Sequence, residues 1–251
     1  MTNGRASGLR CDVLTLFPEI IRAYTGESIL KRAIDKGLLE VGIYNIRDFA
    51  HDKHKVVDDY PYGGGAGMVL KPEPVFKAVQ GIEQDGEKRR RILLCPTGRL
   101  FNYNTALEFS RERQRLLFIC GHYEGIDERV KMLVDDEISI GDFVLTGGEL
   151  AALVIIDASV RFIEGVLGDE RSAIEDSFSW GLLDYPHYTR PGEFMGMKVP
   201  DVLLSGNHRQ IWLWRRKEAL RLTLRRRPEL LEKIKLSDED KRLISEIKEE
   251  S

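Results

Sequence analysis

Short apolar runs alternate with helical patterns over the first two-thirds of the chain. The apolar runs predict five buried strands, at residues 12–17, 39–46, 91–95, 116–120 and 137–145. Apolar positions at helical spacing predict helices at residues 29–34, 72–80, 104–113 and 149–162. Pro18 and Pro96 are expected to stop the first and third strands, because proline has no N–H for the ladder. Such alternation is typical of an α/β domain with a mostly parallel sheet.

The rest of the chain has a different character. The stretch from Arg47 to Gly67 is long, polar and glycine-rich, which predicts a loop of functional length. Residues 169–180 are polar and have no strong period, and the remainder is helical, with Pro228 as a breaker and Ser237 as the cap of an acidic last helix. We expect an α/β domain over residues 1–167 (with 1–10 as a flexible tail), a linker over 168–176 and a small helical domain over 177–251.

Composition narrows the class of protein. With 42% hydrophobic and 31% charged residues, the 251-residue chain has the balance of a soluble globular protein. It has no signal-peptide pattern and no apolar run near the roughly 18–20 residues that cross a bilayer, so we expect a cytoplasmic protein without membrane contact. Cys11, Cys95 and Cys120 form no CxxC pair and lie in apolar runs, which predicts reduced core residues. His51 and His54 lack a third ligand at helical spacing, which argues against a metal site there.

The net charge of the chain is −3, but the charged residues are unevenly distributed along it. From His208 to Arg227 the chain carries eight lysines and arginines against one acid, Glu218. A block of this kind is more often a solvated helix face than a binding surface. Because Trp212 and Trp214 are interleaved with the arginines, contact with nucleic-acid phosphates stays open as a hypothesis.

Three glycine-bearing loops, at residues 62–67, 121–125 and 140–148, are the strongest sign of a ligand site. Glycine permits positive φ and close backbone approach, and ligands of α/β sheets bind at the carboxyl ends of strands. Ordinary turns would explain any one of these loops, but three in one domain favour a ligand. The chain has no GxGxxG after its first strand, no phosphate-binding GxxxxGK[ST] motif and no nucleophile elbow.

Short motifs in a fixed order extend this picture. They lie at residues 16–19 (Leu-Phe-Pro-Glu), 57–59 (Val-Asp-Asp), 62–65 (Tyr-Gly-Gly-Gly), 123–129 (Tyr-Glu-Gly-Ile-Asp-Glu-Arg), 139–142 (Ser-Ile-Gly-Asp), 146–150 (Thr-Gly-Gly-Glu-Leu), 175–178 (Glu-Asp-Ser-Phe), 187–191 (His-Tyr-Thr-Arg-Pro) and 203–208 (Leu-Leu-Ser-Gly-Asn-His). From Cys11 to about Leu231 the chain resembles the tRNA (guanine-N1)-methyltransferase family, TrmD. The resemblance implies a homodimer of SPOUT-type chains with a deep trefoil knot, a connection that general rules of topology would exclude.

The resemblance also implies that the knot loops bind S-adenosylmethionine. The positions that match are Leu94, Pro96, Gly121, Tyr123, Ile140, Gly141, Asp142, Phe143, Val144, Leu145, Gly147 and Gly148. His122 stands where many relatives carry arginine. The family is described as magnesium-dependent, but the sequence offers no carboxylate cage with clear spacing, so we name no metal ligands.

The implied reaction is methylation of guanine N1, immediately 3′ of the anticodon in tRNA. It needs a base for the N1 proton and a stabiliser for charge on O6. By resemblance the base is Asp176, the stabiliser is Arg161, and Glu124 meets the guanine. By residue type alone, Asp176 would be a turn or N-cap residue and Arg161 a surface charge.

The resemblance implies five contacts to the anticodon stem-loop of tRNA, from His51, Asp58, Ser172, Arg215 and Arg216. Two alternatives remain open at this point. One is another SPOUT methyltransferase, acting on a ribose 2′-oxygen or on ribosomal RNA, and the other is a non-catalytic RNA-binding protein. A small-molecule methyltransferase would have no use for the basic segment.

Overall fold

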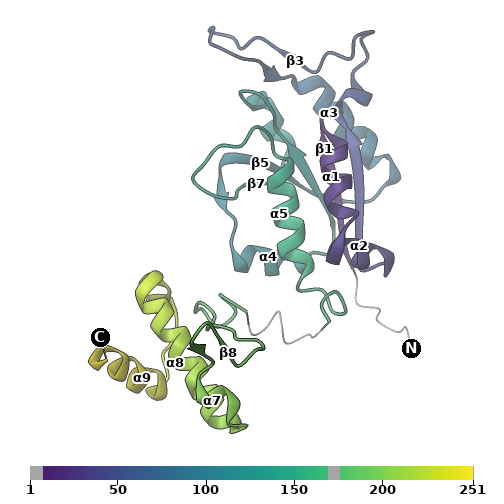
Figure 1. Cartoon of the computed structure of the whole chain (residues 1–251). Coiled ribbons are helices and arrows are strands. Elements are labelled where there is room, and N and C mark those ends of the chain that lie inside the picture. Colours follow the sequence, from purple (N-terminus) through teal and green to yellow (C-terminus); the bar gives the residue numbers. More distant parts are fainter. Residues whose placement is uncertain (1–7, 169–175, 251) are drawn as a thin grey trace. The chain divides into compact units, whose positions relative to one another are not determined.

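A computed structural model describes residues 8–168 and 176–250 of the protein (Figure 1). The chain divides into two compact units, Met1–Gly168 (unit 1) and Asp169–Ser251 (unit 2). Within the described residues, none of the helices combines the length and the apolar character needed to cross a membrane.

Unit 1 is built on a five-stranded sheet of order β2-β1-β6-β5-β7 in which all four pairings are parallel. Its strands are β1 (Leu9–Thr15), β2 (Leu39–Asn45), β5 (Arg89–Leu100), β6 (Arg115–Cys120) and β7 (Asp136–Ser139). The predicted α/β class with a mostly parallel sheet is confirmed. The trefoil knot stays a prediction.

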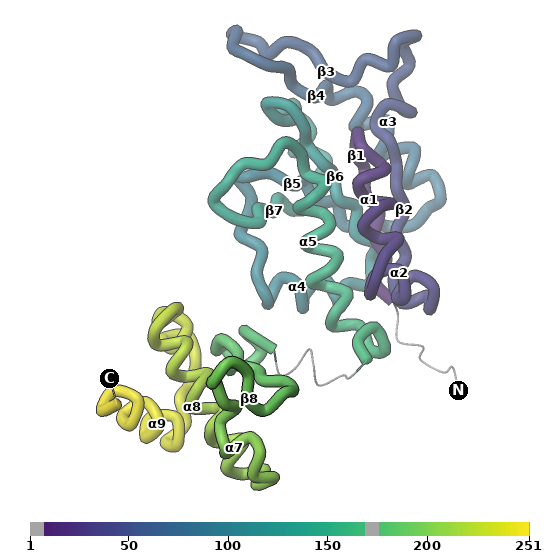
Figure 2. Tube along the Cα trace, in the orientation of Figure 1, coloured from purple at the N-terminus to yellow at the C-terminus, as the bar shows by residue number. Residues whose placement is uncertain are grey.

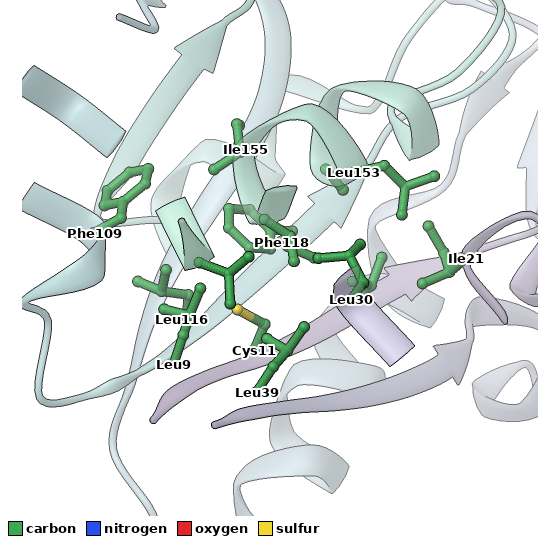
Figure 3. Close-up of a cluster of buried hydrophobic side chains, with 14 of the residues drawn as sticks. Leu9, Cys11, Ile21, Leu30, Leu39, Phe109, Leu116, Phe118, Leu153 and Ile155 are labelled. Atoms are coloured by element: carbon green, nitrogen blue, oxygen red, sulfur yellow. The ribbon is translucent and has the colours of Figure 1, made fainter. Parts of the chain in front are cut away.

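Helices cover both faces of this sheet. They are α1 (Pro18–Thr25), α2 (Ser28–Asp35), α3 (Pro72–Ile82), α4 (Tyr103–Ser110) and α5 (Glu149–Val160), with 3₁₀ turns at Ile46–Phe49, Glu83–Asp85 and Glu128–Leu133. Side chains alternate along β6, so Phe118 joins the buried cluster under α5 while Leu117 joins the cluster under α3. Figure 3 shows the first cluster, where Phe118 lies among Phe109, Leu153 and Ile155. Cys11 and Cys120 are buried there as expected, whereas Cys95 is only half-buried.

Three sequence predictions in unit 1 were wrong. Leu9 and Arg10, expected in a flexible tail, begin β1, and Leu9 is buried. Pro96 does not stop its strand: β5 runs on to Leu100 because its register against β7 shifts between Leu94 and Arg99, and an irregular stretch of strand tolerates proline. The strand predicted over 137–145 ends at Ser139, and the following apolar residues form a loop.

The long polar segment after β2 carries a two-stranded antiparallel arm, β3 (Asp58–Asp59) and β4 (Val69–Leu70). This arm projects beyond the end of the sheet (Figure 2). Its glycines Gly63, Gly64 and Gly65 all have positive φ, which lets the chain reverse there.

Unit 2 has its own small core around Leu182, Leu220 and Leu243. Its elements are β8 (Glu193–Phe194), β9 (Met197–Lys198), α7 (Asp201–Leu204), α8 (His208–Arg226), a 3₁₀ turn (Pro228–Lys233) and α9 (Asp238–Glu249). As predicted, α8 ends before Pro228, and Ser237 caps α9.

Candidate functional site

A cavity of about 160 Å³ lies in unit 1 beside the register shift of β5 and the carboxyl ends of β6 and β7. Its walls come from the segment after Leu94 and from the two glycine-bearing loops at 121–125 and 140–148. Eleven of the twelve positions expected to hold a cofactor line it: Leu94, Pro96, Gly121, Tyr123, Ile140, Gly141, Phe143, Val144, Leu145, Gly147 and Gly148. Asp142 is not among the lining residues. The structure therefore gathers segments up to 54 residues apart into one concave site.

Close backbone packing joins the two loops. The Gly148 amide donates a hydrogen bond to the Gly121 carbonyl over 3.0 Å, and His122 pairs with Gly147 in an isolated bridge. A Cβ at Gly148 would lie 2.8 Å from the Cα of Cys120, closer than carbon atoms pack. Glycine is needed at this position for proximity rather than for an unusual φ, since its φ is −80°.

Cys95 and Pro96 reach the cavity because of the register shift in β5. The Cys95 thiol lies 3.3 Å from both the Thr97 hydroxyl and a Glu137 carboxylate oxygen. Burial raises the pKa of this thiol, and the Glu137 carboxylate raises it further. Cys95 is consequently protonated at neutral pH and is not an activated nucleophile.

The N-terminus of α5 also opens on the cavity. Gly148 is its N-cap, and the buried carboxylate of Glu149 in the first turn accepts a hydrogen bond from the Thr15 hydroxyl over 2.6 Å.

His122 also lines the cavity. Its ring contacts the Phe17 ring at 4.8 Å between centroids. The His122 Nδ1 atom is buried and makes no hydrogen bond to any residue that the structure describes. A buried polar atom without a hydrogen bond, beside a cavity, is an expected feature of a ligand site.

These residues fit S-adenosylmethionine. Leu94, Ile138 and Ala151 offer apolar surface for a nucleobase, and the glycine loops expose backbone groups to polar atoms of a ligand. Some lining residues fall outside the twelve expected cofactor positions. Cys95 was interpreted as a core thiol, while His122, Gly125 and Thr146 lie in the glycine-bearing loops. Ile138 and Ala151 were not expected at a site, because their apolar side chains look like those of any buried strand or helix.

Glu124 lines the mouth of the cavity and is exposed. Its backbone N–H donates to the Met68 carbonyl over 3.0 Å, and a Cβ at Gly67 would meet the Glu124 side chain at 2.5 Å. The arm of β3 and β4 is therefore attached at the cavity mouth. Asp58 lies on that arm, and His51 lies exposed in the segment leading to it.

Arg161 does not reach the cavity within its own unit. It caps the C-terminus of α5, while Gly148 at the opposite end lines the cavity. The 12 residues of α5 span about 18 Å at ~1.5 Å per residue. One chain cannot place this guanidinium beside its own cavity through α5.

Asp176 begins the described part of unit 2 and is exposed. Its carboxylate accepts a hydrogen bond from the Ser177 N–H over 2.8 Å, and its carbonyl accepts one from the Ser179 hydroxyl over 2.7 Å. The residue thus sits in a turn that these two hydrogen bonds close. Ser172, expected to contact tRNA, lies outside the described residues, as does the rest of the expected linker between 169 and 175.

Four of the arginines of α8 divide into two groups. Arg216 is half-buried and makes two hydrogen bonds, of 2.7 and 3.0 Å, to the Asp240 carboxylate on α9. Arg215 is exposed and stacks 4.9 Å above the Tyr185 ring. Arg225 and Arg226 are exposed and form no ion pair with any carboxylate of the described residues. Arg215, Arg225 and Arg226 thus offer charge to solvent, while Arg216 links two helices.

Within residues 8–168 and 176–250, no group of three or more histidine, cysteine, aspartate or glutamate side chains is arranged to hold a metal ion.

Comparison with known proteins gives a consistent result over nearly the whole chain. The family model described as tRNA (Guanine-1)-methyltransferase TrmD matches residues 9–233. A tRNA (guanine-N(1)-)-methyltransferase of Dictyoglomus turgidum is 58% identical over 242 residues, covering 96% of this chain and 98% of the relative. Proteins of the same name from Dehalococcoides mccartyi and Anoxybacillus flavithermus are 61% and 58% identical, over 95% and 96% of this chain and 97% and 98% of theirs. With its parallel sheet, its glycine-walled cavity and these matches, the chain belongs to the tRNA (Guanine-1)-methyltransferase TrmD family.

Proposed function

We propose that this chain is an S-adenosylmethionine-dependent enzyme that methylates N1 of the guanosine immediately 3′ of the anticodon in tRNA. The observation that carries the proposal is the glycine-walled cavity beside β5, β6 and β7, in a chain about 60% identical to proteins named tRNA (guanine-N(1)-)-methyltransferase. A tRNA substrate also favours a cytoplasmic location.

The chemistry assigns a separate task to each side chain. Guanine N1 carries a proton that does not leave at neutral pH, so a base must accept it while charge on O6 is stabilised. Asp176 accepts the N1 proton, and Arg161 stabilises the charge on O6. Glu124 accepts a hydrogen bond from the N–H edge of the guanine at the cavity mouth. When bound, S-adenosylmethionine supplies the methyl group.

A homodimer completes the site. Arg161 stands at the far end of α5 from its own cavity, so a partner chain is the simplest source of this guanidinium. Helices α1 and α5 are neighbours (Figure 1). Several apolar side chains on them or directly before them are exposed, namely Phe17, Ile20, Tyr24, Leu150 and Val154. A patch of this kind marks a protein interface, and two-fold pairing through it would create two equivalent sites.

The direct test is to incubate the protein with S-adenosylmethionine and either tRNA or ribosomal RNA, in parallel reactions, and to map the products by mass spectrometry. We expect 1-methylguanosine immediately 3′ of the anticodon. Methylation of a ribose, or of ribosomal RNA instead of tRNA, would support the alternative SPOUT activities, and tRNA binding without methylation would support an RNA-binding protein.

Asp176→Asn should abolish methyl transfer and leave cofactor affinity nearly unchanged, because an amide keeps the shape of the carboxylate but cannot take the proton.

The composite site is tested with mixed dimers. One chain carries a bulky residue at Gly141, whose Cβ would meet the Phe143 ring at 2.4 Å, and the other carries Asp176→Asn. If Asp176 serves the partner's cavity, one site of the heterodimer collects both defects and the other collects none, so activity returns. Verified heterodimers without activity would assign Asp176 to the cavity of its own chain.

Magnesium is the last element of the proposal. We infer that the reaction uses Mg²⁺. Because the described residues offer no ligand cluster, the ion would need oxygen atoms of the substrate among its ligands, and it would supply positive charge near O6. Chelation with EDTA should then slow methyl transfer and leave cofactor binding unchanged, and added Mg²⁺ should restore the rate.

A further inference from the structure

Unit 2 contains a cavity of about 440 Å³ that the methyl-transfer chemistry does not use. It is an open cavity lined by the segment from Tyr185 to Gly192, by Val199, by Leu203 and Leu204 of α7, and by one face of α8. Ile211, Trp214 and Arg215 form that face, because residues three and four apart point to the same side of a helix. The volume lies in the range of roughly 300–1,000 Å³ typical of small-ligand pockets.

The lining combines aromatic faces with positive charge. Tyr188 and Trp214 lie with their ring centroids 6.2 Å apart and their planes 57° from parallel, and Tyr188 is half exposed. Arg190 and Arg215 also line the cavity and are both exposed. None of the described lining residues is acidic. Asp184, next to Tyr185 in sequence, is paired with the lining residue His187 over 2.8 Å.

These features select among ligand classes. Aromatic walls without arginines would suit a cationic ligand, but two guanidinium groups repel one. An acidic peptide would satisfy the arginines and would leave the faces of Tyr188 and Trp214 unused. A nucleobase with its phosphate uses both, because the base stacks on an aromatic face while the phosphate pairs with arginine.

We propose that this cavity binds one unstacked base of the tRNA substrate together with its adjacent phosphate. Tyr188 and Trp214 stack on the base, and Arg190 and Arg215 hold the phosphate. The inference rests on the proposed function only in naming tRNA as the nucleic acid. It makes unit 2 a reader of a locally unpaired nucleotide rather than a uniformly basic surface.

The first experiment compares Tyr188→Ala with Tyr188→Phe in the full-length protein. Loss of one stacking face should raise the KM for tRNA about 5- to 150-fold, whereas Phe keeps the ring and should change KM less than twofold. Because Tyr188 is half exposed, neither change threatens the core of unit 2. Equal KM values for both variants and the wild type would overturn the proposal.

The second experiment follows tryptophan fluorescence and does not depend on activity. The chain has three tryptophans, so Trp180→Phe with Trp212→Phe leaves Trp214 as the reporter, and Trp180→Phe with Trp214→Phe leaves Trp212. Trp212 is on the same helix, is exposed, and does not line the cavity, which makes it a matched control. We expect tRNA to quench Trp214 strongly and Trp212 little.

The outcomes separate this proposal from the enzymatic one. If the wild-type protein methylates tRNA but Trp214 is not quenched, the base pocket is refuted and the methyltransferase stands. If adenosine monophosphate quenches Trp214 and tRNA does not, the cavity binds a free nucleotide and the proposal is again refuted. If Trp214 is quenched and no methylation occurs, the pocket stands and the proposed activity fails.

Discussion

Gly148→Ala tests whether close packing of two loops shapes the cofactor cavity. The backbone at Gly148 has φ −80° and ψ −6°, which alanine adopts without strain, so any effect must come from the added methyl group. That methyl group would lie 2.8 Å from the Cα and 3.1 Å from the Cβ of Cys120. Carbon atoms pack at about 3.5–4.0 Å, so the loop must retreat by roughly 0.7 Å or more.

The cost follows from this displacement. Overpacking a well-packed site destabilises a protein by about 1–3 kcal/mol, which for a chain of this size lowers Tm by roughly 2–12 °C. Because Gly121 and Gly148 both line the cavity, their separation also changes its width. Each ~1.4 kcal/mol of misfit in the bound form weakens Kd tenfold, and we expect S-adenosylmethionine to bind about tenfold more weakly or worse.

Calorimetric titration of cofactor and a thermal melt measure the two effects on one sample. Gly168→Ala is the matched control, because a Cβ at Gly168 meets nothing within 4 Å. The control should keep wild-type affinity and Tm. A Gly148→Ala protein that binds cofactor and melts like the wild type would refute the view that this contact sets the shape of the cavity.

Three further predictions concern neighbouring arginines, a thiol and a buried carboxylate. Arg215→Ala should reduce the slope of log tRNA affinity against log salt by about one. Arg216→Ala breaks the pair with Asp240, so it should lower Tm and leave that slope unchanged. If Arg216→Ala alone reduced the slope, Arg216 and not Arg215 would be the residue that contacts phosphate. Maleimide should label Cys95 before the two buried cysteines in the native protein, as read by mass spectrometry. The labelling rate should rise with pH and fall when cofactor is bound. Labelling of a buried cysteine first would contradict this prediction. Burial disfavours the charged Asp240, but hydrogen bonds from Arg216 and Ser237 outweigh burial and lower its pKa. The stability that this carboxylate gives unit 2 is therefore full at neutral pH and is lost as pH falls below about 4, and Asp240→Asn should make helix content less sensitive to acid in circular dichroism.

The sequence predicted the centres of the strands better than their ends. Leu116 to Cys120 was identified because both faces of that strand are buried, which requires a continuous apolar run. The same rule failed for residues 143–145. Phe143 and Val144 are 54% and 81% exposed and belong to the wall of a cavity, so their apolar character reflects a binding surface rather than a sheet. Periodicity alone cannot separate these two uses of apolar residues.

Site residues followed a similar rule. The glycine loops were recognisable because glycine has few other uses after a buried strand, and the structure gathers two of the three loops at one cavity. Arg161 and Asp176 could be named only by resemblance, since neither lies in the cavity wall and a single sequence does not show which chain supplies them. Arg215 and Arg216 looked equivalent in sequence. Only the packing of α9 against α8 distinguishes them, because Asp240 comes from 24 residues further along the chain.

The strand order of unit 1 has a consequence for folding during synthesis on the ribosome. β1 lies between β2 and β6, and Cys11 of β1 pairs with Leu116 of β6, more than 100 residues later. At a synthesis rate of about 5–20 residues per second, one edge of β1 stays without its partner for roughly 5–20 s. During that time Val13 and its apolar neighbours, fully buried in the finished sheet, must be shielded by non-native contacts or by a chaperone. A circular permutation that brings β1 and β6 close together in sequence would shorten this interval. It should therefore raise the yield of folded protein.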